Sequence, residues 1–395
     1  MEYISERIEK TRVSDSCDVF VAGGGVAGIA AALSAAREGS HVILAEKCCV
    51  LGGLASAGLI TYYLPICDGC GKQVSFGLAE ELLKLSVKHG AEEEIPECWI
   101  NDAEVETRAK SERYRARFNP QMFALLAEKI LVENGVKILY DTRFCDTIGN
   151  EKIDYVVIEN KSGRSAIAVK SVVDASGDGD ICQFSDAETE IFGHNILAAW
   201  HYFYDGEKLD LKSMGAADNV GENEHTERLV DRDFTGVDGE EVSEFLLISH
   251  KQILDYVVEQ KKENSNYVPA TMATIPQLRM TRRIAGEYTL TLADEHKDFA
   301  DSVGLFSNWR KSGPVYALPF SALYSKKVKN LITAGRCISC DDGMWEIARV
   351  IPVCAVSGEA AGLAASMSDD FAEIDIKVLQ EKLKSRGVVL SEKDL

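Results

Sequence analysis

The sequence predicts an α/β fold in which a parallel-sheet domain with a three-stranded β-meander is interrupted by an inserted mixed α/β domain. Within about thirty residues near the start, a short apolar segment, a glycine-rich turn, an Ala-rich helical segment and a second apolar segment follow one another. The same strand, glycine and helix pattern returns from residue 330, after a more polar middle that lacks it. We therefore expect the first and last parts of the chain to build one domain.

The first unit is read from hydrophobicity and glycine positions. Residues 18–22 are apolar and partly β-branched, which is typical of a buried strand. A glycine turn leads into a helix over 29–37, and Gly39 suits the helix end. A second strand is expected over 41–45, and the residues before about Ser16 are expected to form a polar arm.

Later elements follow from capping and turn signals. Asn119 and Pro120 supply an N-cap and a first helical position, so a helix is expected from there to Gly135. Alternating residues around two turn signals predict the meander. The other expected elements are a strand at 137–140, the meander over 143–170, strands at 171–175 and 331–334, a helix over 243–261 and a helix from about 352.

The charge balance excludes some partners. The chain has 63 acidic and 43 basic residues, a formal net charge of −20, which repels phosphate backbones and anionic membrane surfaces. We therefore expect neither nucleic acid nor a membrane as partner. The first residues lack the basic-then-apolar layout of a secretory signal, so a cytoplasmic location is expected, with the 11 cysteines mostly reduced and packing.

A dinucleotide fingerprint carries the strongest functional signal. Gly23, Gly25 and Gly28 have the G-x-G-x-x-G spacing between a predicted strand and helix, and Glu46 ends the next strand, 18 positions after Gly28. Gly23 permits the tight turn, Gly25 lets the backbone approach a pyrophosphate, and Gly28 lets helix and sheet pack closely. Glu46 is expected to accept hydrogen bonds from the adenosine ribose. The first domain is therefore expected to be Rossmann-like.

FAD fits the remaining glycines better than NAD. Gly52 and Gly53 form a second glycine turn soon after Glu46, and FAD is longer than the first unit alone can cover. Two later strands, before residues 175 and 335, end in small residues, which lets an extended cofactor lie across the sheet edge.

These blocks resemble the FAD-dependent oxidoreductases of the glutathione-reductase fold type, in the branch related to fumarate reductase and succinate dehydrogenase flavoproteins. The resemblance spans most of the chain from 18 to 366. Besides the fingerprint it rests on the blocks at 67–69, 73–74, 77–82, 282–288, 316–320, 335–339, 349–352 and 358–362.

The resemblance implies that the helix after Arg349 points its N-terminus at the flavin pyrimidine, where the positive dipole end stabilises anionic reduced flavin. Many related flavoproteins carry an acidic ribityl ligand directly after the glycine that ends their last cofactor-binding strand, which is Gly335 here. Arg336 stands there instead, so Asp341 or Asp342 are alternative ribityl ligands. The residues expected to bind FAD are Gly23, Gly25, Val26, Ala27, Gly28, Glu46, Lys47, Gly52, Gly53, Ala55, Ala175, Ser176, Gly177, Asp178, Gly335, Arg336, Arg349, Ile351, Pro352 and Val353.

We accordingly predict a discontinuous FAD-binding domain of residues 16–60, 113–185 and 326–395. Residues 61–112 and 186–325 are predicted to form the substrate-covering domain.

Few side chains are candidates for catalysis. Arg279, Arg282 and Arg283 form a basic cluster that suits a substrate carboxylate or an enolate, or else pairs with acidic residues. The other candidates are a histidine in an aromatic strand, whose alternative is a hydrogen-bonded structural role, and a tyrosine at the domain junction, whose alternative is packing. The last is an acid between Gly335 and the helix that is expected to face the flavin. The predicted catalytic residues are Arg282, Arg283, His201, Tyr316 and Asp342.

Two C-x-x-C pairs, Cys67 with Cys70 and Cys337 with Cys340, have spacing that suits zinc, an iron–sulfur cluster or a redox disulfide. The pairs are far apart in the sequence, so packing is expected and no metal is predicted.

The expected reaction is hydride transfer between a small organic substrate and flavin N5. One alternative is a flavoprotein with structural FAD that acts as a hydratase or isomerase, and another is an electron-transfer subunit that uses the C-x-x-C pairs. The sequence leaves the electron acceptor and a homo-oligomeric state open.

Overall fold

The computed structural model describes residues 10–101, 103–216 and 228–395. Its main sheet has seven strands in the order β6-β2-β1-β9-β8-β7, with β17 beside β9, and β6, β2, β1, β9 and β17 run parallel. These strands are β1 (Val13–Ala22), β2 (Val42–Ala45), β6 (Lys137–Leu139), β7 (Arg143–Gly149), β8 (Ile153–Asn160), β9 (Gly163–Asp174) and β17 (Leu331–Thr333). The predicted α/β class is confirmed.

The meander and the parallel sheet share one strand. The first half of β9 pairs antiparallel with β8, and its last residues pair parallel with β1 and β17. The three-stranded meander over 143–170 is therefore confirmed, but the separate strand predicted at 171–175 is the continuation of β9. The sequence has no turn residue near Lys170 and Ser171, and the strand continues through both residues into the buried part of the sheet.

The sheet also reaches further toward the N-terminus than predicted. β1 begins at Val13, and residues 13–17 pair with 166–169 of β9. The predicted polar arm to Ser16 is wrong because backbone pairing holds this stretch although Val13 and Ser14 are exposed.

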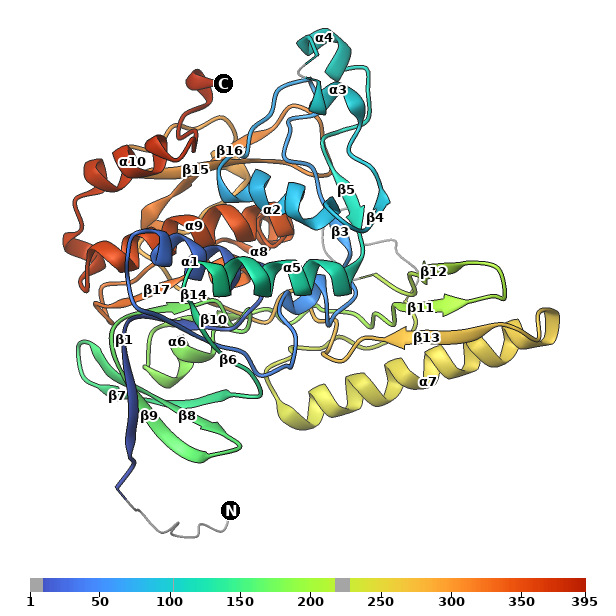
Figure 1. Ribbon diagram of the computed structural model, residues 1–395, viewed down its shortest axis with the longest axis horizontal. Coiled ribbons are helices and arrows are strands. Elements are labelled where there is room, and N and C mark those ends of the chain that lie inside the picture. The colour runs from blue at the N-terminus through green and yellow to red at the C-terminus, as the bar shows by residue number, and fades with distance from the viewer. Residues whose placement is uncertain (1–9, 102, 217–227) are drawn as a thin grey trace.

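Two small-residue helices cover one face of the sheet, α1 (Val26–Arg37) and α9 (Ile351–Met367). A Cβ on Gly358 would lie 2.3 Å from the Ala27 carbonyl oxygen, and one on Gly362 would lie 2.1 Å from that of Ala31. The two helices therefore touch at glycine, which explains the Ala/Gly composition. α5 (Pro120–Glu133) lies beside them, with the Asn119 side chain as its N-cap as predicted (Figure 1).

Among the described residues, no single helix is long and apolar enough to cross a membrane. α8 (Asp342–Ala348) and α9 pass a length and composition test only as a pair bent by 90°. The cytoplasmic location stays a prediction.

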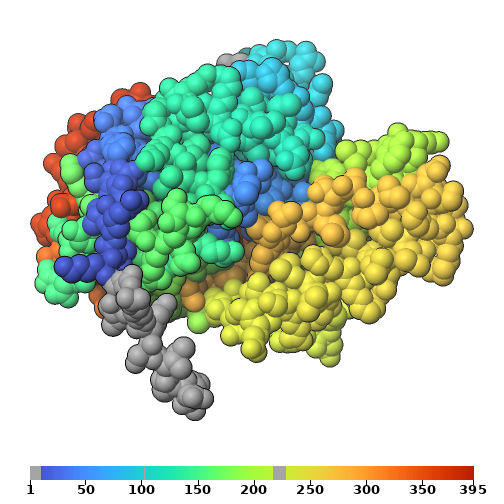
Figure 2. Space-filling model, turned by 60° about the horizontal axis from the view of Figure 1, so that its bottom comes forward, coloured from blue at the N-terminus to red at the C-terminus, as the bar shows by residue number. Residues whose placement is uncertain are grey.

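A lobe beside the main body contains α7 (Gly239–Glu263) and a three-stranded sheet in the order β12-β11-β13 (Figures 1 and 2). α7 contains the predicted helix 243–261 and is capped by the Asp238 side chain. The lobe strands are β11 (His201–Tyr204), β12 (Leu209–Lys212) and β13 (Val268–Met272).

The remaining helices and strands are β3 (Tyr62–Tyr63), α2 (Leu78–Val87), β4 (Ala91–Glu93), α3 (Glu97–Ile100), α4 (Val105–Arg108), β5 (Ala116–Phe118), α6 (Asp180–Phe184), β10 (Thr189–Ile191), β14 (Arg282–Ile284), β15 (Ser302–Ser307), β16 (Val315–Pro319) and α10 (Ile376–Ser385). Side chains from α2, β15 and β16 belong to the same apolar cluster as α1 and α9. The predicted domain boundaries cross this cluster, and they stay a prediction.

Candidate functional site

A cavity of about 480 Å³ lies at the carboxyl ends of the parallel strands. The segments that follow β1, β2, β9 and β17 all line it, as does Arg143, which follows β6 by four residues. Ligands of open α/β sheets bind at this edge, because successive strand ends converge there. The cavity is therefore the candidate functional site.

The glycine turn forms one wall. Gly23 has φ +98°, and a Cβ there would lie 2.7 Å from the Ala175 carbonyl oxygen. A Cβ on Gly28 would lie 1.8 Å from the Gly23 carbonyl oxygen, whereas a Cβ on Gly25 would meet nothing within 4 Å. Gly23 and Gly28 thus allow the chain to pack on itself, and Gly25 leaves space in the cavity.

Gly25 is also the N-cap of α1, and no side chain caps that helix end. Val26 and Ala27 of the first turn line the cavity. The first N–H groups of a helix lack intrahelical partners and carry the positive dipole end. This wall is therefore suited to an anion such as a pyrophosphate.

Glu46 is held at the end of β2 by two backbone N–H groups. Its Oε2 accepts a hydrogen bond from Gly24 N at 2.7 Å, and its Oε1 accepts one from Cys48 N at 2.7 Å. Its side chain is buried and lines the cavity. A fixed carboxylate with remaining lone pairs suits the two hydroxyls of a ribose.

Asp178 lies between two cations at the cavity wall. Its carboxylate is 3.4 Å from Arg336 Nη2 and 3.6 Å from Lys47 Nζ, and it accepts a hydrogen bond from Thr281 Oγ1 at 2.9 Å. Burial raises the pKa of Asp178, but the Arg336 and Lys47 charges outweigh it and hold the pKa below its usual range. The pKa of Lys47 is raised, chiefly by Asp178.

Asp180, two residues on, has the opposite shift. Burial and then the negative charge of Asp178 raise the pKa of Asp180 to about 7, although Arg282 Nη1 lies 3.6 Å from it. Asp180 lines the cavity and was not predicted from the sequence. Asp180 is therefore a cavity-lining group that can hold or release a proton near neutral pH.

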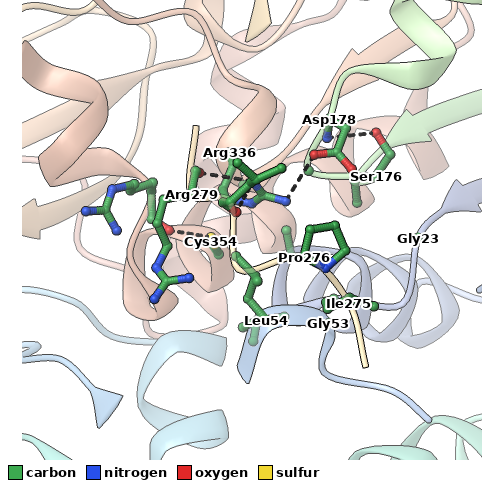
Figure 3. A pocket seen from close by; sticks show the side chains of 18 of the residues that line it. Gly23, Gly53, Leu54, Ser176, Asp178, Ile275, Pro276, Arg279, Arg336 and Cys354 are labelled. Carbon is green, nitrogen blue, oxygen red and sulfur yellow. Dashed lines mark hydrogen bonds and ion pairs between the residues drawn. The ribbon is translucent and has the colours of Figure 1, made fainter. Parts of the chain in front are cut away.

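Arg336 spans the cavity wall. Besides Asp178, its guanidinium donates to the carbonyl oxygens of Leu278 at 3.3 Å and Arg279 at 3.0 Å. Figure 3 shows Arg336 between Ser176 and Asp178 on one side and Arg279 and Cys354 on the other. Arg336 therefore connects the segment after β9 to residues 275–279, hereafter the strap.

The two proposed substitutes for the ribityl acid lie elsewhere. Asp341 is the N-cap of α8 and accepts a hydrogen bond from Met344 N at 2.7 Å. Asp342 pairs with Arg283 at 3.5 Å. Neither lines the cavity, so the structure does not support Asp341 or Asp342 as a ribityl ligand, because the start of α8 holds both.

Most residues predicted to bind FAD line this one cavity. Gly28, Pro352 and Val353 do not line it; Gly28 packs α1 against the sheet, and the other two belong to the first turn of α9, directly after the cavity-lining Ile351. The lining residues among those predicted are Gly23, Gly25, Val26, Ala27, Glu46, Lys47, Gly52, Gly53, Ala55, Ala175, Ser176, Gly177, Asp178, Gly335, Arg336, Arg349 and Ile351. Whether they bind FAD stays a prediction.

Of the five predicted catalytic residues, only Arg282 lines the cavity. Its side chain is buried, and Nη1 donates to the Asp178 carbonyl oxygen at 3.3 Å. Arg283, one residue on, points to the other side of β14: it pairs with Glu190 at 2.7 Å and lies over the Trp345 ring. The predicted basic cluster is therefore split by strand alternation.

The other catalytic candidates do not line the cavity either. His201 is buried in β11, where its Nδ1 lies 3.3 Å from the Ala199 carbonyl oxygen and its ring packs edge-on to Tyr256. Burial lowers the pKa of His201, which favours its neutral imidazole. Tyr316 is buried and stacks on Phe306. These contacts agree with the structural roles that were their alternatives, and a catalytic role for either residue stays a prediction.

The cavity is also lined by residues that lie outside the sequence motifs. They come from the segment 54–64, the start of α7 and the strap 275–279, and most are apolar. Arg279 of the strap, which belongs to the predicted basic cluster, lies over the Trp200 ring, 5.3 Å from its centroid. Pro276 was a visible turn signal, but nothing in the sequence paired this strap with the fingerprint.

All cysteines are free thiols. Among the described residues, no group of three or more His, Cys, Asp or Glu side chains could hold a metal ion, so the two C-x-x-C pairs do not gather into one site. Cys354, which lines the cavity, has a pKa raised to about 11 by burial and is a neutral thiol.

Comparison with known proteins gives a family and a set of distant structures. A family model described as FAD dependent oxidoreductase matches residues 18–198 and 203–383. A search of curated proteins found no match.

Among solved structures, the chain is similar to a geranylgeranyl bacteriochlorophyll reductase-like protein from Thermoplasma acidophilum, with 14% identity, 94% of this chain and 84% of that chain covered, and a TM-score of 0.48. L-proline dehydrogenase from P. horikoshii has 11% identity, covers 95% and 100%, and has a TM-score of 0.45. A flavocytochrome c3 fumarate reductase has 14% identity, covers 90% and 78%, and has a TM-score of 0.42.

Proposed function

The chain belongs to the FAD-dependent oxidoreductase family, and on that premise we propose that it transfers a hydride between a small organic substrate and N5 of an FAD bound in the cavity. The observation that carries this proposal is the convergence of the fingerprint, Glu46 and the later strand ends on one cavity.

The residues present fit FAD. The open side of Gly25 leaves room for a pyrophosphate at the N-terminus of α1, and Glu46 offers carboxylate oxygens for a ribose. A second helix N-terminus, that of α9, also meets the cavity through Ile351, and no side chain caps it. FAD, when bound, supplies the acceptor or donor for two electrons.

The protein contributes orientation, charge and apolar contact surface. The dipoles of α1 and α9 favour negative charge at two places in the cavity, and Arg349 adds a cation beside the second. Apolar side chains such as Leu54, Ile60 and Pro276 also line the cavity and offer an apolar surface to a bound flavin or substrate. Asp180 can hold a proton near pH 7 or release it.

The test is anaerobic mixing of the FAD-loaded protein with candidate substrates while the visible flavin absorbance is followed. Bleaching of the flavin by a substrate supports hydride transfer. Turnover with unbleached flavin and no change in redox state would support the rival, a hydratase or isomerase with structural FAD, and would overturn the proposal.

A further inference from the structure

A second cleft, of about 540 Å³, adjoins the FAD cavity and is rich in arginine. It is lined by residues 64–65, 111–113, 115 and 309–310, which bring together Arg113, Arg115 and Arg310. Leu64 lines both this cleft and the FAD cavity, so that side chain forms a wall common to the two. Three cations gathered beside the proposed redox site call for an explanation in a chain of net charge −20.

Arg113 is fixed by neutral acceptors. Its Nη1 donates to the Trp309 carbonyl oxygen at 2.9 Å, and its Nη2 donates to the carbonyl oxygens of Cys67 at 2.7 Å and Asn308 at 2.9 Å. No carboxylate of the described residues forms an ion pair with it. Arg113 therefore forms part of the cleft wall, and among the described residues its charge has no carboxylate partner of its own, although Glu112 also lines the cleft.

Arg115 is held loosely. Its one described ion pair, with Glu112, has an N···O distance of 3.9 Å, and the two side chains are 43% and 75% exposed. Such a pair contributes little free energy and can be exchanged for a ligand at small cost. Arg115 is therefore the cation that can turn onto a bound anion.

Arg310 links the cleft to the helix that leads into the cavity. Its guanidinium pairs with Glu346 of α8 and lies 4.2 Å from the Trp309 ring centroid. The Trp309 indole N–H donates to the Glu346 carbonyl oxygen at 3.2 Å. α8 runs into α9, whose first residue lines the FAD cavity, so this wall is continuous with the redox site.

We propose that the arginine cleft anchors an oxyanion, a carboxylate or a phosphate, carried by a small organic substrate whose reacting part extends past Leu64 into the FAD cavity. Guanidinium groups match both anions with parallel N–H donors. A cleft of positive charge in a negative chain also concentrates and orients anionic ligands. The proposal rests on the proposed function, because the cleft serves a substrate of that site.

The test is calorimetric titration of the FAD-loaded protein with benzoate, succinate and phenyl phosphate, with benzamide as a neutral counterpart. The variant is Arg115→Gln. Its matched control is Arg164→Gln in the meander, because Arg164 also pairs with a glutamate at 3.9 Å and is 50% exposed. We expect at least one anion to bind, with affinity about tenfold weaker in Arg115→Gln and unchanged in Arg164→Gln.

The same titrations are followed in the visible spectrum of the flavin. A spectral shift that saturates with the calorimetric isotherm supports a ligand that reaches the FAD cavity. Tightest binding by phenyl phosphate assigns a phosphate, and tightest binding by benzoate or succinate assigns a carboxylate.

The proposal is overturned if none of the three anions binds, if benzamide binds as well as benzoate, if Arg115→Gln binds like the unchanged protein, or if binding leaves the flavin spectrum unaltered. Failure of the proposed function would show differently, as an absence of bound FAD or of flavin bleaching by any substrate, and the calorimetric arm would still report on the cleft.

Discussion

Gly25→Ala should separate cofactor binding from folding. The backbone at Gly25 has φ −67° and ψ −179°, which any residue adopts, and the added methyl would meet no protein atom within 4 Å. The apoprotein should therefore change in unfolding free energy by less than about 1 kcal/mol, because the lower entropy of the unfolded chain offsets the poorer N-cap.

The same methyl would occupy the space left for the pyrophosphate. If it weakens two charge-assisted hydrogen bonds from the helix N-terminus, at about 1.5 kcal/mol each, FAD affinity falls by about 3 kcal/mol. That loss corresponds to a Kd about 100-fold higher. Gly28→Ala is the contrasting variant, since its Cβ would lie 1.8 Å from the Gly23 carbonyl oxygen and must push α1 off the sheet. It should cost the apoprotein about 3 kcal/mol.

The assay pairs urea unfolding of the apoprotein with a fluorescence titration of FAD for each variant. The reasoning predicts a stable Gly25→Ala protein that binds FAD poorly, and a Gly28→Ala protein that is impaired in both measurements. Wild-type FAD affinity in Gly25→Ala would refute the assignment of this turn as the pyrophosphate site.

Three further predictions concern charged groups. Burial raises the pKa of Glu359 to about 7, so the folded state keeps a proton that the unfolded state loses above about pH 4.5, and the unfolding free energy should fall by roughly 3 kcal/mol between pH 4.5 and 7. The Glu359→Gln side chain can still accept a hydrogen bond from Leu78 N but does not titrate, so this pH dependence should be smaller in urea unfolding of that variant. Glu46→Gln should place an amide NH₂ group opposite one of the two backbone N–H donors, and the FAD Kd measured by fluorescence titration should rise about tenfold. An unchanged FAD affinity would count against the role of Glu46 in binding the ribose. Arg336→Met should leave Asp178 with one cation and lower apoprotein stability by about 2 kcal/mol in urea unfolding, whereas Arg336→Lys should lose less; equal losses would contradict a charge effect.

The fold was largely readable from the sequence because it depends on local signals. The fingerprint, the Asn119 cap and the alternation of the meander each specify a short stretch of backbone. The error at β1 arose where backbone pairing, which has no side-chain signature, extends a strand through exposed polar residues. The continuation of β9 through Ser171 was missed because nothing in the pattern distinguishes two adjoining strands from one.

The site was readable in part. Glycines and strand ends marked the wall that the parallel sheet provides, because its carboxyl edge gathers them whatever the loops do. The opposite wall depends on long-range contacts, such as Arg336 with the Leu278 and Arg279 carbonyl oxygens, which leave no spacing in the sequence. His201 and Tyr316 failed to reach the cavity for the same reason, since aromatic composition predicts burial but not its location.

A crystal structure of the protein with FAD bound tests the central claim most directly. We predict density for FAD in the cavity at the strand ends, with the adenosine ribose at Glu46, the pyrophosphate at Gly25 and the flavin ring reaching the N-terminus of α9 at Ile351. FAD bound elsewhere, or an empty cavity at a saturating FAD concentration, would contradict the account.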